Sequence, residues 1–200
     1  MNALTAFSIW AQRNRWIWAA IGVLLLWLVL SVVTNRFSLS SLSGIMLSAS
    51  FLTVVGIGQM FVVTTGRGNI DLSVASVITL SAFVALLTIK GQDANLAIGV
   101  TAAVLLGLAV GLLNSLLVVG LGIPAIIATL ATGYVLATAT LLSNKALPGF
   151  AVSPALKDLA TGRISGVPIM AIIAILGVAA ASFVLLCTVF GQLLSAVGQN

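Results

Sequence analysis

The sequence predicts an all-α membrane protein, a polytopic bundle of about six transmembrane helices. Of its 200 residues, 61% are hydrophobic and only 6% are charged, with a mean hydropathy of +1.29. Soluble domains carry about 25% charged residues, so this composition cannot cover the surface of a water-soluble fold. Long uncharged segments separate the few charges, and none of them shows the polar alternation of a transmembrane β-strand.

The uncharged segments determine the number and the positions of the helices. About 20 apolar residues cross the roughly 30 Å hydrocarbon layer as a helix, which pairs every backbone polar group internally. The segment 94–144 is long enough for two helices, and Gly120, Gly122 and Pro124 mark the break between them. The expected spans are Trp16–Val33, Ile45–Thr64, Leu72–Ile89, Ala94–Val119, Pro124–Leu142 and Pro168–Val189.

Two indications of topology disagree. The first span lacks a small-x-small cleavage site after it, so we interpret it as a retained helix and not as a signal peptide. Arg13 and Arg15 precede this helix and favour a cytoplasmic N-terminus by the positive-inside rule. With six spans, that orientation places five basic loop residues outside and only Arg67 inside. This distribution is the opposite of what the positive-inside rule favours. The outside residues are Arg36, Lys90, Lys145, Lys157 and Arg163.

The reactive side chains are too few for catalysis or metal binding. The chain has no His and no Glu, and its only acids are Asp71, Asp93 and Asp158, beside the single Cys187. Catalytic and metal sites draw mainly on these residue types. No lysine lies in a Gly-x-x-x-x-Gly-Lys-Ser/Thr motif, so the chain cannot bind ATP through a P-loop. We therefore expect no enzyme, no cofactor and no metal, and the scattered basic residues predict no nucleic-acid partner.

The segment Thr65–Ser73 places polar residues between two apolar helices. It contains Asn69, two glycines and the charge pair Arg67 and Asp71. A charge at mid-bilayer costs about 2.5–3.5 kcal/mol, so such groups are paired or face water. Asp71 either caps a helix that begins at Leu72 or lines a transport pathway at a helix break. The two interpretations are compatible if the cap also holds the wall of the pathway.

Further polar and small residues lie within the apolar spans. Asn114 is the one amide in the fourth span, where it forms an interhelical hydrogen bond or lines a pathway. Thr129 has two interpretations as well, because its hydroxyl can line a polar seam or bond back to its own helix. Gly107 and Gly111 form a small-xxx-small pattern that is typical of close helix packing.

Three ordered motifs resemble those of the ribose-type ABC sugar-importer permeases. Gly58–Gly66 and Ile70–Ser76 are similar to the family's Gly-Gln-Thr helix and its Gly-Gly-Ile-Asp-Leu-Ser-Val-Gly-Ser core. Gly111–Asn114 and Ile123–Leu130 are similar to Gly-x-x-Asn-Gly and Ile-Pro-Ala-Phe-Ile-Ala-Thr-Leu. Phe190–Asn200 resembles the Phe-Gly-Arg…Gly-Gly-Asn start of the cytoplasmic loop that meets the ATPase. The departures are Asn69, Ala75 and Ser115 in place of Gly, and Gln192 in place of Arg.

The resemblance implies one permease domain over residues 1–200, about two-thirds of a family member, truncated at the start of a cytoplasmic coupling loop. It implies a multi-pass subunit of the bacterial inner membrane that forms a homodimer or heterodimer of permeases. A cytoplasmic ATP-binding subunit would hydrolyse ATP, and an extracytoplasmic substrate-binding protein would deliver a sugar or sugar-like molecule. The residues expected near the pathway or in its supporting shell are Asn69, Asp71, Asn114 and Thr129. Those expected to begin the ATPase-coupling element are Phe190 and Gly191.

Two other functions stay open from the sequence. An ion-coupled secondary carrier or a channel usually needs acids or unwound carbonyls inside the membrane, and Asp71 is the one acid near the interior. A non-transporting membrane scaffold would need no pathway at all. Dependence on an ATPase and a binding protein separates the importer from the carrier, and measurable flux separates both from the scaffold.

Overall fold

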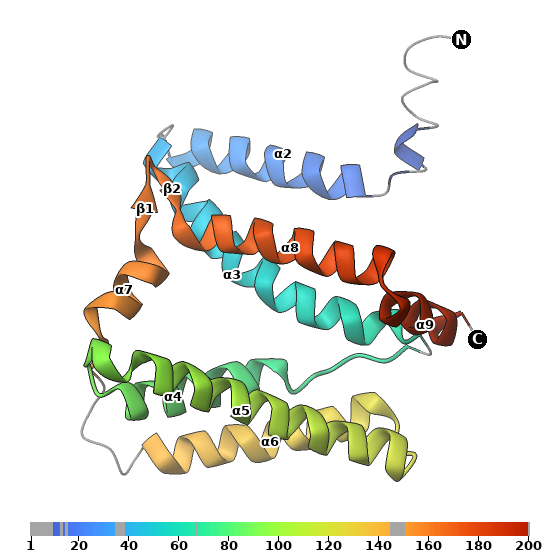
Figure 1. Cartoon of the computed structure of the whole chain (residues 1–200). Helices are drawn as coiled ribbons and strands as arrows, with labels where there is room; N and C mark the ends of the chain where they lie inside the picture. The colour runs from blue at the N-terminus through green and yellow to red at the C-terminus, as the bar shows by residue number, and fades with distance from the viewer. Residues whose placement is uncertain are drawn as a thin grey trace. The chain divides into compact units, whose positions relative to one another are not determined.

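The chain divides into two compact units, residues 1–45 and residues 46–200. The structure, a computed structural model, describes residues 10–12, 14, 16–34, 39–66, 68–144 and 151–199. The first unit holds α2 (Trp16–Thr34) and the start of α3 (Leu39–Thr64), while the second unit holds the rest of α3 and all later elements (Figure 1). The predictions that involve Arg13, Arg15, Arg36, Arg67 and Lys145 fall outside the described residues.

Helices make up almost all of the second unit. After α3 the order is α4 (Val74–Ile89), the 3₁₀ turn η1 (Asp93–Asn95), α5 (Leu96–Ser115), the π-helical turn η2 (Leu116–Gly120), α6 (Ala125–Asn144), α7 (Pro154–Thr161), β1 (Arg163–Ile164), β2 (Val167–Pro168), α8 (Ile169–Cys187) and α9 (Val189–Gly198). The two short strands pair antiparallel, with Ile164 opposite Val167. Neither this hairpin nor α7 was expected from the sequence, because both lie in the polar connection before the last span.

The predicted spans are confirmed as helices, with one of them shorter than expected. In the part of the chain that the structure describes, five helices are long and apolar enough to cross a membrane: Ile17–Thr34, Leu42–Thr64, Asp93–Gly120, Ala125–Asn144 and Ile169–Cys187. They match five of the six expected spans, which confirms the all-α polytopic class. The expected span Leu72–Ile89 is the 16-residue α4, about 24 Å long at 1.5 Å per residue. It begins late because residues 68–73 form a polar, non-helical loop.

Helices α4, α5 and α6 lie side by side (Figure 1). Glycines permit the close approach: a methyl group on Gly99 of α5 would collide with the buried side chain of Ile89 in α4. A methyl carbon on Gly133 of α6 would lie 3.3 Å from the Cα of Ser73. Small residues at a crossing let membrane helices pack closely. The end of α4 is thereby packed against α5, and its start against α6.

The expected packing role of Gly107 and Gly111 is wrong within this chain. A methyl group on either glycine would meet no atom of the described residues within 4 Å. Close packing along α5 uses Gly99 instead, where Ile89 fills the space beside the missing side chain. The pattern misled because small-xxx-small spacing is common in apolar helices and does not specify which face meets a neighbour.

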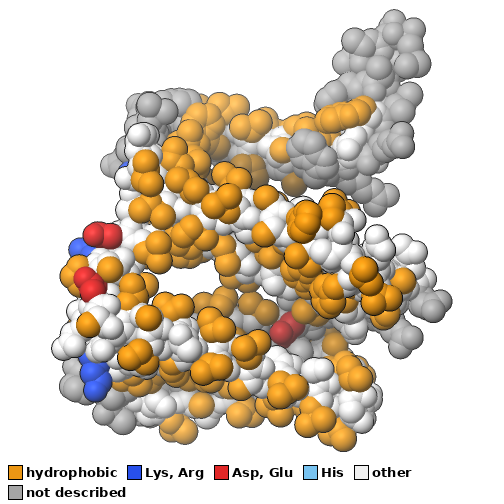
Figure 2. Space-filling view, viewed as in Figure 1, with side chains coloured by type: hydrophobic (Ala, Val, Ile, Leu, Met, Phe, Trp, Pro, Cys, Tyr) orange, Lys and Arg blue, Asp and Glu red, His pale blue; other side chains and the backbone are white. Residues whose placement is uncertain are grey.

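Apolar side chains cover the outer surfaces of the helices. Leu108 and Leu112 of α5 are among the most exposed residues, at 64% and 74%, and Figure 2 shows hydrophobic side chains spread along the helices. Such a surface is stable in lipid and unfavourable in water. Charged side chains gather near α7 and the α4–α5 connection (Figure 2). There the backbone N–H of Ala155 donates to Oδ1 of Asp93 at 3.0 Å, which joins the two connections.

Candidate functional site: a polar cavity at the start of α4

The loop before α4 is organised by Asp71. Its Oδ1 accepts two hydrogen bonds from Ser73, one from the backbone N–H at 2.8 Å and one from the hydroxyl at 2.6 Å. The first helical bond of α4 follows directly, from the N–H of Val77 to the carbonyl of Ser73 at 2.9 Å. A short polar side chain that bonds the backbone two residues ahead is a common way to start a helix.

The predicted cap at Leu72 is therefore displaced. The helix begins at Val74, and Ser73, not Asp71, occupies the N-cap position. Ser73 makes no side-chain cap bond to the helix, because its hydroxyl is already engaged with Asp71. Asp71 stabilises the residue that precedes the helix instead of the first helical turn. Its expected partner Arg67 lies outside the described residues.

Asn114 joins this loop to α5. Its Nδ2 donates to the hydroxyl oxygen of Ser73 at 3.0 Å, across 41 residues of sequence. Asn114 is only 7% exposed and Ser73 is fully buried, so the bond lies inside the helix bundle. The interhelical hydrogen bond that the sequence offered as one interpretation of Asn114 is present. A continuous chain of bonds thus runs from Asp71 through Ser73 to Asn114.

Thr129 joins the same loop to α6. Its hydroxyl oxygen accepts from the backbone N–H of Leu72 at 3.0 Å and donates to the carbonyl of Ala125, one turn back, at 2.8 Å. The carbonyl of Ile70 lies 3.4 Å from the same oxygen. Thr129 therefore bonds back to its own helix, which was one of its two interpretations, and its oxygen also holds the loop, which was not expected. The sequence could not have distinguished these alternatives, since the Leu72 contact is long-range.

Asn69 lies at the other end of the loop. Its Nδ2 donates to the hydroxyl oxygen of Thr65 at 2.9 Å, and Thr65 in turn donates to the carbonyl of Val62 at 2.7 Å. These bonds attach the loop to the end of α3. Among the described residues Asn69 has no hydrogen bond to Asp71, Ser73 or Asn114, but it lines the same cavity.

A cavity of about 740 Å³ brings these polar residues together. Its size lies within the range of about 300–1,000 Å³ that is typical of small-molecule sites. All four predicted pathway residues line it, together with apolar side chains that include those of η2 and α9. The lining residues are Val62, Thr65, Asn69, Ile70, Asp71, Gly111, Asn114, Ser115, Val118, Val119, Ala125, Thr129 and Val197.

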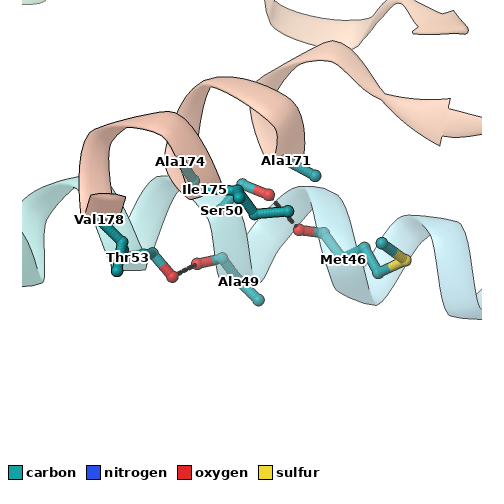
Figure 3. Close-up of a pocket in the computed structure, with 8 residues that line it drawn as sticks. All are labelled: Met46, Ala49, Ser50, Thr53, Ala171, Ala174, Ile175 and Val178. Carbon is teal, nitrogen blue, oxygen red and sulfur yellow. Dashed lines mark hydrogen bonds between the residues drawn. The ribbon is translucent and has the colours of Figure 1, made fainter. Parts of the chain in front are cut away.

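A second, smaller cavity lies between α3 and α8. Its volume is about 320 Å³, and small or apolar side chains surround it: Met46, Ala49, Ser50, Thr53, Ala171, Ala174, Ile175 and Val178 (Figure 3). The hydroxyls of Ser50 and Thr53 donate to the carbonyls of Met46 and Ala49 on their own helix, at 2.5 and 2.8 Å. Since these hydroxyl protons are already used, the cavity offers little to a polar ligand.

The two predicted coupling residues lie at the start of α9. Phe190 is 58% exposed, whereas Gly191 is buried at the corner between α8 and α9. The N–H of Gly191 donates to the hydroxyl oxygen of Thr188 at 3.2 Å, and a methyl group on Gly191 would collide with the backbone of Leu185. The corner between α8 and α9 therefore requires a residue without a side chain at position 191. The coupling role of both residues stays a prediction.

Sequence reasoning missed Ser73, Gly66 and Gly198. Ser73 connects Asp71 to Asn114, and the Asp-x-Ser spacing at the start of a helix is the signal that could have found it. Gly66 and Gly198 bring the ends of α3 and α9 together, with Gly66 at φ +72°. No local pattern predicts that contact, because the two glycines belong to different segments.

An apolar helical bundle with a polar cavity at a helix break is typical of membrane transport proteins. A family model described as "Branched-chain amino acid transport system / permease component" matches residues 41–200. The chain belongs to this family of permease components, which confirms the kinship with importer permeases predicted from the motifs. It is accordingly a multi-pass protein of the inner membrane.

Curated relatives carry the name autoinducer 2 import system permease protein LsrC. The protein from Escherichia coli O157:H7 is 33% identical over 192 residues, which cover 94% of this chain and 55% of the relative. That from Yersinia pseudotuberculosis serotype O:1b is 34% identical over 196 residues, 94% and 53% of the two chains. That from Photorhabdus luminescens is 38% identical over 122 residues, 60% and 36%. The chain spans about half the length of the first two relatives, and no solved structure matches it significantly.

Proposed function

We propose that this chain forms part of the membrane-spanning permease subunit of an ATP-driven importer for a sugar or sugar-like small molecule. The observation that carries the proposal is the cavity beside α4, where Asp71, Asn114 and Thr129 meet inside an otherwise apolar bundle. Polar groups at such depth are costly, so they are usually retained for function. The family and the relatives named as autoinducer 2 import permeases support the same class of function.

The energy for import comes from a separate ATP-binding subunit. The sequence has no P-loop motif and no His or Glu with which to activate water. We assign the contact with that subunit to the start of α9, at Phe190 and Gly191. An exposed aromatic side chain beside a rigid corner is a suitable contact for a partner protein.

The remaining partners follow from the same class of protein. An extracytoplasmic substrate-binding protein delivers the solute, and a second permease, identical or related, completes the pathway. Residues 1–200 act as one permease domain in this proposal. Alternating access then requires that ATP binding in the partner favour one of two arrangements of the helices.

Uptake into proteoliposomes tests this function. The protein is reconstituted with the candidate ATP-binding subunit and the binding protein, and radiolabelled autoinducer 2 and D-ribose are supplied outside with ATP inside. The proposal predicts uptake that requires ATP and both partners. Uptake driven by a sodium or proton gradient without them would identify a secondary carrier, and passive flux would identify a channel. A membrane-inserted protein with no flux under any condition would be a scaffold.

A further inference from the structure

Asn114 holds an acceptor that nothing in the described chain satisfies. The residue is 7% exposed, and its Oδ1 is buried without a hydrogen-bond donor among the described residues. More than about 90% of buried polar groups in proteins have a partner. Asn114 also lines the polar cavity, and an unpaired acceptor on a residue of that lining is an indication of a missing ligand group.

The direction of the hydrogen bonds fixes which atom of the amide is free. The Asp71 carboxylate can only accept, so the Ser73 hydroxyl proton points to Asp71. The Ser73 oxygen is then left with lone pairs for Asn114, which must donate to it through Nδ2. A flipped amide would set two acceptors against each other. The two hydrogen bonds that link Asn114 through Ser73 to the Asp71 carboxylate therefore turn the Oδ1 of Asn114 away from Ser73.

A glycine on the same helix as Asn114 leaves free space in the cavity wall. Gly111 lies three residues earlier on α5, on the same face of the helix, and both residues line the cavity of about 740 Å³. A methyl group on Gly111 would meet no described atom within 4 Å, so the space there is free. The described lining residues include one carboxylate, that of Asp71, and no lysine or arginine.

We infer that Asn114 is a specificity-determining residue that accepts a hydrogen bond from a hydroxyl group of the transported solute. The inference rests on the proposed function and adds to it the atom that recognises the solute. A hydroxyl supplies the proton that Oδ1 lacks, whereas an ionised carboxylate supplies none. Solutes that lack the matching hydroxyl leave the acceptor unpaired and are transported less efficiently.

The test compares single-deoxy analogues with their parent sugar. Uptake of D-ribose, 2-deoxy-D-ribose and 5-deoxy-D-ribose is measured in the reconstituted system for the wild type and for Asn114→Leu. In the wild type, loss of the hydroxyl that meets Asn114 should reduce transport efficiency by about tenfold or more. In Asn114→Leu the parent sugar should fall to the level of that analogue, so that the ratio between them approaches one. A general structural defect would lower all sugars together and keep the ratio.

A second pair of variants covers the case in which Asn114→Leu does not fold. Gly111→Val adds a side chain to the cavity wall three residues before Asn114, and Gly107→Val makes the same change one turn earlier, at a glycine that does not line the cavity. Gly111→Val should abolish sugar-induced thermal stabilisation of the purified protein in nanodiscs, and Gly107→Val should preserve it. Equal effects of the two substitutions would overturn the inference.

The outcomes separate the two proposals. An unchanged parent-to-deoxy ratio in Asn114→Leu, with ATP-dependent uptake intact, overturns the role of Asn114 and leaves the importer standing. A changed ratio in uptake that needs no ATPase overturns the importer and leaves the role of Asn114 standing. If the wild type neither binds nor transports any of these sugars or autoinducer 2, both proposals fail.

Discussion

Gly198 of α9 lies against Gly66 at the end of α3, and neither residue has space for a side chain. A methyl group on Gly66 would lie 2.7 Å from the Cα of Gly198, and one on Gly198 would collide with the carbonyl of Thr64. Val197, the neighbour of Gly198, lines the polar cavity. The proposed coupling helix therefore touches both the end of α3 and the cavity.

The glycine contact predicts a difference between two similar substitutions. Gly66 and Gly68 both have φ +72°, but a methyl group on Gly68 meets no described atom within 4 Å. Gly68→Ala should cost only the strain of the left-handed backbone, about 1–2 kcal/mol. Gly66→Ala should cost about 1–3 kcal/mol more, because it also displaces α9. Thermal unfolding in detergent measures the difference, and equal midpoints for the two variants would exclude the contact.

The hydroxyl of Thr129 is expected to stabilise the loop before α4. Thr129→Val keeps the shape of the side chain but leaves the Leu72 N–H unpaired, which costs about 1–3 kcal/mol. Thr138→Val is the matched control on α6, since Thr138 is exposed and its hydroxyl bonds only to the carbonyl of Tyr134, at 2.9 Å. We expect a lower unfolding midpoint for Thr129→Val alone. The same loss in both variants would mean that the bond to Leu72 contributes nothing.

Asp71 should act through its acceptor oxygen more than through its charge. Asp71→Ala leaves the N–H and the hydroxyl of Ser73 without their acceptor, so we expect uptake to fall by about tenfold or more. Asp71→Asn keeps an oxygen at the same position, and the loss should be smaller than for Asp71→Ala, because a neutral bond keeps about half the energy of a charge-assisted one. Initial uptake rates, corrected for the amount of protein in the membrane, decide between these expectations. Equal loss in the two variants would assign the role to the charge.

The predicted topology can be tested with cysteine labelling. The chain has one native cysteine, Cys187, so the background is Cys187→Ser. With a cytoplasmic N-terminus and six crossings, Gln92→Cys should react with a membrane-impermeant maleimide in intact cells. Gln192→Cys should react only after the membrane is opened. The reverse pattern would show that the basic residues of the later loops, and not the first helix, determine the orientation.

Much of the fold could be predicted because the membrane imposes simple rules. Uncharged segments long enough to cross a bilayer must be helical, and α2, α3, α5, α6 and α8 follow this rule. The length of α4 could not be predicted in the same way, because hydropathy does not show that Leu72 and Ser73 lie outside the helix. That boundary depends on Thr129 holding the N–H of Leu72 and on Ser73 bonding to Asp71.

The site was predictable in its residue types but not in its connections. Asp71 and Asn114 stood out because polar residues are rare in apolar helices. Their link through Ser73 depends on the packing of α4 against α5, which brings together residues 41 positions apart. For the same reason the glycine pattern at Gly107 and Gly111 was misinterpreted, since periodicity reveals a face of the helix but not what lies beside it.

The central claim is that the cavity beside α4 is a water-filled part of a transport pathway within the membrane. Accessibility of substituted cysteines to a charged methanethiosulfonate reagent tests it most directly. In the Cys187→Ser background, Val118→Cys lines the cavity, and Leu112→Cys lies on the exposed surface of the same membrane span, Asp93–Gly120. We predict that Val118→Cys reacts and that D-ribose slows the reaction, while Leu112→Cys does not react. A charged reagent that reaches neither position, or both equally, would contradict the claim.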